Sequence, residues 1–365
     1  MGTAKLSQNL CLCLTLGLTL LTAASAHGQS LYFPAADDHW ETVTPEQAGF
    51  RSAGVEQALA VAAARHSSAV VMLHNGRIMA EAYWQPANPP AGYSNFVQGQ
   101  DQAGRVIEDV ASAQKSVAAV ITGIAQEKGL LTIDDPVTQY LGAGWSQADG
   151  AQEAAITLRH LLTMTSGLAT DMGYAAPAGS AWLYNTPAYH TLMRVVETAT
   201  GKDRNTVTTE WISGPMAMPN TRWTARPWAD AAIGTGLATT ARELARFGLM
   251  IQAGGFWQER QIIADQNFLQ EMLQPSQTLN PAYGYLWWLN GQEFALGAGA
   301  QATRTEGPLI AAAPADLMAM QGAHDRKLYI VPSLGLVITR LGAAGGDDSS
   351  SFNDAFWQAL MAARN

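Results

Sequence analysis

The residues with the clearest chemical potential are a serine and a lysine three positions apart, Ser112 and Lys115. Side chains at positions i and i+3 share one face of a helix, so the hydroxyl and the amine can meet. Residues 117–125 are nearly all apolar or small, which predicts that this helix is buried. A partly desolvated lysine beside a serine is a known way to activate a nucleophile. The alternative is an ordinary pair on a surface helix, because Ser-x-x-Lys often occurs by chance.

Other catalytic signatures are absent from the sequence. There is no Gly-x-Ser-x-Gly elbow, no His-Glu-x-x-His motif and no cluster of residues spaced like metal ligands. An α/β-hydrolase or a metalloenzyme is therefore disfavoured, and we predict neither a metal nor a cofactor.

The composition fits a large exported domain. Of the 365 residues, 48% are hydrophobic and 14% are charged, with a formal net charge of −9. This is enough apolar material for a sizeable core. No basic run indicates a nucleic-acid partner.

The first 26 residues are typical of a signal peptide. Lys5 supplies the positive charge, residues 10–21 form a short apolar run, and Ala24-Ser25-Ala26 matches a cleavage site. We therefore expect a mature N-terminus at His27, no integral membrane segment after cleavage, and a periplasmic or secreted protein. Both cysteines lie in this segment, so no disulfide is expected. The alternative is an uncleaved anchor.

The elements that must position the serine and the lysine come from both ends of the chain. Residues 55–66 read as a helix, and 69–73 with 78–83 as two strands joined by a turn at Asn75-Gly76. Residues 85–107 are rich in Pro, Gly, Asn and Gln, which predicts a long irregular loop. Strands at 327–331 and 336–340 and a helix over 349–364 close the chain.

The middle of the chain reads as helical. A short helix is expected from Ile156, another from Thr186 to Thr200 with Thr186 as its N-cap, and a third from Thr240 to Ile251. The predicted fold class is therefore α+β: an antiparallel sheet built from both termini and flanked by helices, with an inserted, mostly helical subdomain. The expected catalytic domain spans 45–365, with an α/β part at about 45–106 and 305–365 and a helical part at about 107–304.

Several segments in this order carry a specific family resemblance. They are residues 111–116, 130–136, 156–168, 179–185 and 234–244. The sequence resembles the serine β-lactamases and penicillin-binding-protein-like hydrolases on the class C side, over about residues 45–362. That group includes family VIII-type esterases and aminohexanoate-dimer-type hydrolases. The resemblance implies a β-lactamase/transpeptidase-like fold.

The resemblance also implies catalytic roles. Ser112 matches the nucleophile, Lys115 its activating partner, and Tyr184 the tyrosine of the Tyr-x-Asn element, which helps pass protons. These roles suit the residue types, because a serine needs a base and a phenol can relay a proton. The N–H groups that open the Ser112 helix can hold a developing oxyanion.

Two departures from the family pattern concern substrate binding. Thr186 stands where the family has asparagine, so we expect either Asn185 or the Thr186 hydroxyl to serve. No Lys-Thr-Gly triplet occurs near the C-terminus, where the chain instead carries Gly322 and His324. Asn185, Thr186, Gly322 and His324 are the candidate substrate-binding residues, although a structural role is the alternative for His324. Trp182, Trp287 and Trp288 are either pocket wall or core.

These observations predict a secreted serine hydrolase that forms an acyl-enzyme on Ser112. The missing Lys-Thr-Gly cation favours carboxyl esters or small amides over lactams as substrates. The first alternative is a β-lactamase or a D-stereospecific peptidase. The second is a catalytically inactive penicillin-binding-like protein. The sequence specifies neither the physiological substrate nor the oligomeric state.

Overall fold

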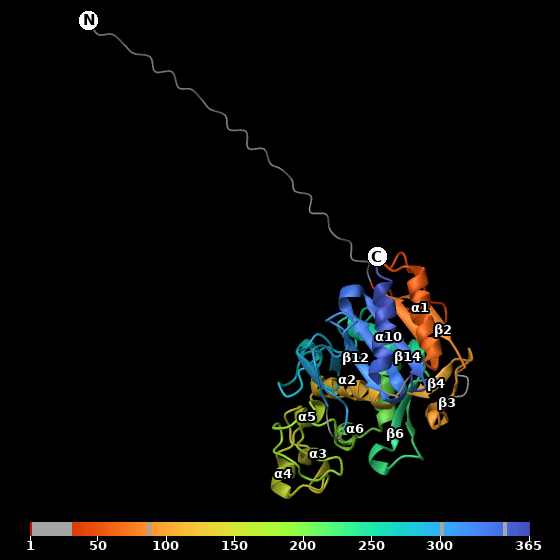
Figure 1. Ribbon diagram of the computed structural model, residues 1–365. Helices are drawn as coiled ribbons and strands as arrows, with labels where there is room; N and C mark the ends of the chain where they lie inside the picture. Colours follow the sequence, from red (N-terminus) through yellow and green to blue (C-terminus); the bar gives the residue numbers. More distant parts are fainter. Residues whose placement is uncertain (2–30, 86–88, 300–302, 346–348) are drawn as a thin grey trace. The chain divides into compact units, whose positions relative to one another are not determined.

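A six-stranded antiparallel sheet joins the two ends of the chain (Figure 1). Its order is β2-β1-β14-β13-β12-β9, so the early strands lie directly beside the late ones. The bounds are β1 Ser67–His74, β2 Arg77–Tyr83, β9 Trp288–Leu289, β12 Met318–Gly322, β13 Arg326–Val331 and β14 Leu336–Gly342. This computed structural model describes Met1 and residues 31–85, 89–299, 303–345 and 349–365. The predicted signal peptide, 1–26, lies outside them apart from Met1.

The turn between β1 and β2 forms where the sequence predicts it. Asn75 and Gly76 both take left-handed backbone angles, with φ of 48° and 84°, as a tight hairpin requires. A side chain at Gly76 would also overlap the carbonyl of Tyr32. Glycine is therefore required here both by conformation and by close packing.

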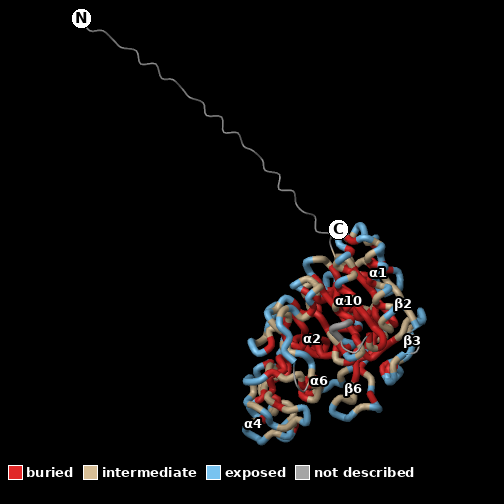
Figure 2. The backbone as a smooth tube through the Cα atoms, viewed as in Figure 1, coloured by how far each residue is buried: buried red, intermediate tan, exposed pale blue. Residues whose placement is uncertain are grey.

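Helices cover both faces of this sheet. On one face lie α1 (Ser52–Ala64) and α10 (Ser349–Ala362), where Tyr329 of β13 packs against Trp357 with ring centroids 5.4 Å apart. On the other lies α8 (Ala241–Gln252), whose Gly248 approaches Leu328 and Val337 closely. Successive residues of β13 thus face opposite layers, as the pleat dictates. The buried strands and helices form the interior in Figure 2.

The middle of the chain holds most of the helices, together with several short strands. Besides α8, its helices are α2 Gln114–Glu127, α3 Thr138–Leu141, α4 Gly150–Ala154, α5 Leu158–Leu162, α6 Thr186–Thr200, α7 Arg204–Thr208 and α9 Gln266–Met272. The α+β class and the antiparallel sheet from both termini are confirmed. Among the described residues, no helix combines the length and apolar character needed to cross a membrane.

The irregular loop predicted for 85–107 is wrong in part. This segment contains a 3₁₀ turn, η1 (Tyr93–Phe96), and the strand β3 (Val97–Gln100), and it runs into β4 (Val106–Asp109). With β5 (Arg222–Ala225) and β6 (Thr235–Thr239) these strands form a second sheet, ordered β3-β4-β6-β5. The pairing of β4 with β6 joins segments about 130 residues apart, so local composition carries no sign of it. Strand β4 leads directly into the Ser112 segment.

Candidate active site

Ser112 sits in a short 3₁₀ turn, η2 (Ala111–Ala113), that precedes α2. The residue before it, Ala111, has a left-handed φ of 51°, which is unfavourable for a residue with a side chain. Asp109 holds this conformation, because its Oδ1 accepts the Ala111 N–H at 2.8 Å. Asp109 is in turn paired with Arg226 through two bonds of 2.6 and 2.7 Å, and both side chains are buried. A buried bidentate ion pair thus fixes the turn that presents the serine.

Gly322, at the end of β12, lets the sheet approach this turn. A Cβ at Gly322 would overlap the carbonyl oxygen of Val110 and lie 3.2 Å from the Ala113 nitrogen. Only a glycine therefore allows β12 to pass beside Ser112. The predicted site residue Gly322 does lie at the site, and its contact there is close backbone packing.

Lys115 lies one turn further along, with its amine against the serine. Its Nζ lies 2.9 Å from Ser112 Oγ and 3.1 Å from Thr186 Oγ1. The rings of Tyr184 and Tyr189 flank the amine, with centroids 4.6 and 4.8 Å away. The side chain is only 2% exposed. Burial lowers the pKa of Lys115 well below its usual value, and the positive charge of Arg226 lowers it further. The surroundings therefore favour the neutral amine.

Tyr184 shows the opposite shift. Burial raises the pKa of its phenol well above 10, and a hydrogen bond with Ser112 opposes part of that rise. Its ring stacks on Trp288 with centroids 5.8 Å apart and an angle of 24° between the planes. The phenol is thus protonated at neutral pH and held rigidly beside the serine.

The structure gives Asn185 the capping role that the sequence predicted for Thr186. Asn185, rather than Thr186, is the N-cap of α6, since its side chain accepts the Ala188 N–H at 3.0 Å. Its amide nitrogen donates to the carbonyls of Leu168 and Ala169, and the residue is 1% exposed. These contacts commit Asn185 to the fold, which corrects the prediction that it contacts substrate. Thr186 is free to hold Lys115.

A pocket of about 510 Å³ opens on Ser112. Tyr184 and Trp288 form one wall, while Gly322 and His324 lie along the end of β12. Trp288 is thus a wall residue as well as part of the core, whereas Trp182 and Trp287 do not line this pocket.

His324 lies at the pocket in a constrained setting. It takes a left-handed φ of 60°, and its ring meets Phe96 with centroids 4.9 Å apart. Burial and the charge of Arg326 lower the pKa of its imidazole. A neutral imidazole is therefore present at the pocket where the sequence predicts a substrate contact.

Lys327 is a pocket residue that sequence reasoning missed. It belongs to β13, directly opposite Gln321 of β12, and its Nζ donates to Gln321 Oε1 at 2.8 Å. Asp325 Oδ1 lies 3.4 Å from the same nitrogen. Burial lowers the pKa of Lys327 to about 8, against the opposing effect of Asp325. The hairpin register between 321 and 327 was the sign that could have revealed it, since opposite residues share a face.

The comparisons with known proteins agree with this architecture. A family model described as beta-lactamase matches residues 53–351. The chain belongs to the beta-lactamase family. An uncharacterized protein of Alkalihalophilus pseudofirmus is 26% identical over 248 residues, covering 61% of this chain and 70% of that protein.

Solved structures support the fold of this beta-lactamase family member. A putative beta-lactamase from Bacteroides dorei superposes with a TM-score of 0.63 at 19% identity, covering 85% of this chain and 97% of that one. A putative 6-aminohexanoate-dimer hydrolase from Bacillus anthracis superposes with a TM-score of 0.61 at 18% identity, covering 90% and 88%. The predicted β-lactamase/transpeptidase-like fold is confirmed, and the chain has the fold of a family of hydrolases.

Proposed function

We propose that this protein is an exported serine hydrolase that forms an acyl-enzyme on Ser112, acting on carboxyl esters or small amides. The observation that carries the proposal is the 2.9 Å contact between Ser112 Oγ and the amine of a buried lysine. A neutral amine has a lone pair to accept the serine proton, and burial keeps Lys115 neutral. Thr186 orients that amine from the other side.

In the first half-reaction, Ser112 Oγ attacks the substrate carbonyl carbon while its proton passes to Lys115 Nζ. The oxyanion that forms lies against the Ser112 N–H, at the positive end of the helix segment that begins there. The bond from the carbonyl carbon to the leaving oxygen or nitrogen then breaks. That atom takes a proton, and the acyl group remains on Oγ.

Tyr184 supports the proton transfer to the leaving group. Its phenol is protonated, because burial raises its pKa, and it lies beside both the serine and the lysine amine. A protonated phenol can donate to the leaving atom and be reprotonated by Lys115. In the second half-reaction, water replaces the alcohol or amine, the same groups act in reverse, and the acid is released.

The pocket favours uncharged substrates. Its amine, Lys327, is already engaged by Gln321 and Asp325, so its charge is partly neutralised before a ligand enters. No cation stands on β12 itself, whose residues are Met-Ala-Met-Gln-Gly. A lactam substrate that carries a carboxylate therefore gains less here than a neutral ester does. Hydrolysis of lactams or D-amino peptides is the alternative activity.

An inactive binding protein is the remaining alternative. Such a protein would not need a base, a nucleophile and a proton relay in mutual contact. Here Ser112 and Tyr184 line one pocket, and the Lys115 amine contacts both of them from behind, which supports an enzyme. The 6-aminohexanoate-dimer hydrolase with the same fold lends support to amides as a second substrate class.

A substrate panel tests the proposal. Purified mature protein is assayed with p-nitrophenyl acetate and butyrate, a D-amino acid anilide and a chromogenic cephalosporin, with Ser112→Ala as the background control. We expect kcat/KM for the esters to exceed that for the cephalosporin by about a hundredfold or more. A cephalosporin that proved the better substrate would contradict the argument from charge. Equal rates for wild type and Ser112→Ala on every substrate would favour the inactive protein.

A further inference from the structure

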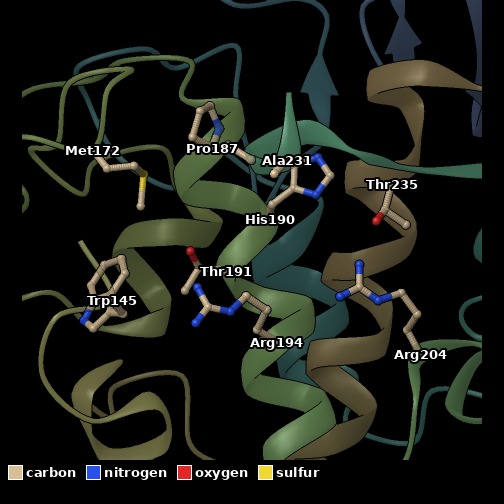
Figure 3. Close-up of a pocket in the computed structure, with 10 residues that line it drawn as sticks. Trp145, Met172, Pro187, His190, Thr191, Arg194, Arg204, Ala231 and Thr235 are labelled. Carbon is tan, nitrogen blue, oxygen red and sulfur yellow. The ribbon is translucent and has the colours of Figure 1, made fainter. Parts of the chain in front are cut away.

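A second pocket, of about 250 Å³, lies along α6 (Figure 3). Pro187, His190, Thr191 and Arg194 project into it from the helix, with Trp145 and Met172 on one side. Ala231 and Thr235 lie on the other side, near Arg204 of α7. The residues that line it are distinct from those around the Ser112 pocket.

The charged groups of this pocket are all basic. Among the described residues that line it, Arg194, Arg204 and His190 carry basic side chains and none is acidic. Arg204 is neutralised outside the pocket by Glu197, with bonds of 2.8 Å from both Nε and Nη2. Arg194 has no hydrogen-bond or ion-pair partner in the part of the chain that the structure describes, and its guanidinium extends toward Trp145 (Figure 3). One uncompensated positive charge therefore faces the cavity.

His190 adds an unsatisfied polar atom. Its Nε2 is buried and has no hydrogen-bond partner among the described residues. Burial lowers the pKa of His190 to about 3, helped by the positive charges of Arg226 and Arg204. The imidazole is thus neutral in a positive environment. The residue lines the cavity, so its resonance can report a ligand that binds there.

Apart from the hydroxyls of Thr191 and Thr235, the rest of the lining is apolar. Trp145 and Met172 face the same cavity as the Arg194 guanidinium, and Pro187 with Ala231 and Ala232 complete it. A fully hydrated inorganic anion would leave these surfaces unused. A guanidinium beside an indole and a thioether suits a ligand with a carboxylate at one end and a hydrocarbon body at the other.

We infer that this pocket is a binding site for a small amphiphilic carboxylate, with Arg194 as its anchor. The carboxylate pairs with the guanidinium, and the hydrocarbon body packs on Trp145 and Met172. This inference does not rest on the proposed hydrolase activity, because the two pockets share no lining residue.

The test uses hexanoate as the probe and hexanamide, its neutral counterpart, as the matched ligand. Binding is followed by NMR through the imidazole resonance of His190, which is assigned as the one missing from the spectrum of His190→Gln. We expect hexanoate to shift this resonance with a Kd of about 1 mM. Hexanamide should bind about tenfold more weakly, because it lacks the charge-assisted bond to Arg194.

Three variants locate the site. Arg194→Gln should weaken hexanoate binding about tenfold, whereas Arg260→Gln, at an exposed arginine on another hairpin, should leave it unchanged. Ala231→Leu should weaken binding without altering any charge, since it adds volume at the pocket lining. Because Arg194 and Ala231 are exposed, these changes leave the core intact.

Four results would overturn the inference. The first is no shift of the His190 resonance with hexanoate. The second and third are binding of hexanamide, or of sulfate as an inorganic anion, as tight as that of hexanoate. The fourth is unchanged hexanoate binding in Arg194→Gln. The last would place hexanoate elsewhere, most simply in the Ser112 pocket. Loss of esterase activity has no bearing on any of them, so failure here is separable from failure of the hydrolase proposal.

Discussion

At the residue scale, the proposed chemistry depends on one amine. Lys115 is buried, hydrogen-bonded to two hydroxyls and flanked by two aromatic rings. No carboxylate oxygen lies within ion-pair distance of it in the described part of the chain. A buried lysine of this kind lowers the stability of the fold, because the unfolded chain would keep it protonated. The same burial makes its amine available as a base.

The pH dependence of activity follows from that environment. Activity needs the neutral amine, so kcat/KM should fall as pH falls through the pKa of Lys115. Since burial places that pKa well below 10.5, a neutral ester should be hydrolysed at neutral pH. The raised pKa of Tyr184 means that no loss from phenol ionisation is expected below about pH 10. A pH–rate profile, corrected for spontaneous hydrolysis, measures both limbs.

An acidic limb centred near pH 10.5 would contradict this account, because it would indicate a lysine with an ordinary pKa.

The lowered pKa of Lys115 also affects the stability of the fold. The unfolded state binds a proton at Lys115 at any pH below about 10.5, whereas the folded state releases it at a lower pH. Between those two pKa values Lys115 therefore opposes folding, and its penalty shrinks as pH rises.

Thr186 is the positioning residue for that amine. Thr186→Val keeps the shape of the side chain but removes the hydroxyl 3.1 Å from Lys115 Nζ. We expect kcat for an ester to fall about tenfold, because the amine loses one of the two groups that orient it. Thr186→Ser, which keeps the hydroxyl, is the matched control and should retain most of the activity. Equal activity in the two variants would show that the contact is incidental.

At the element scale, the close approach of β12 to the Ser112 turn depends on Gly322. Gly322→Ala places a methyl group against the Val110 carbonyl, so strand and turn must separate. We expect kcat/KM to fall at least about a hundredfold and the melting temperature to drop. Gly150→Ala, at a helix start where a methyl group meets open space, is the control and should change neither. A fully active Gly322→Ala would show that the turn tolerates movement.

The elements that the sequence predicts best are those specified locally. Helix α6 runs from Thr186 to Thr200 as expected, because a proline at its start and Gly201 at its end are local signals. Its cap was misassigned, since both Asn185 and Thr186 are good caps and only the packing of Lys115 decides between them. The contact between Ser112 and Lys115 was predicted from their spacing together with the apolar run that follows them.

The sequence does not reveal features that depend on contacts between segments far apart in the chain. Strands β4 and β6 pair although about 130 residues separate them. The Asp109–Arg226 ion pair that holds the serine turn joins residues 117 positions apart. A residue's sequence neighbours do not reveal such partners, because the tertiary fold brings them together.

At the scale of the whole molecule, export remains a prediction from the first 26 residues. Expressed with its own leader in a Gram-negative host, the protein should be recovered from the periplasm with His27 as its N-terminus. Intact-mass measurement of the recovered protein checks the cleavage site. Material that keeps residues 1–26 and sediments with membranes would contradict the prediction and favour an uncleaved anchor.

The central claim is that Ser112 is the nucleophile, and covalent labelling tests it most directly. Other serines are engaged elsewhere: Ser116 donates to the Leu286 carbonyl at 2.7 Å, and Ser180 to the Pro177 carbonyl at 2.6 Å. A fluorophosphonate probe should therefore add once to the native protein, with the adduct on the peptide that contains Ser112. Ser112→Ala should not be labelled. An adduct on Ser116, Ser166 or Ser180, or equal labelling of Ser112→Ala, would contradict the account.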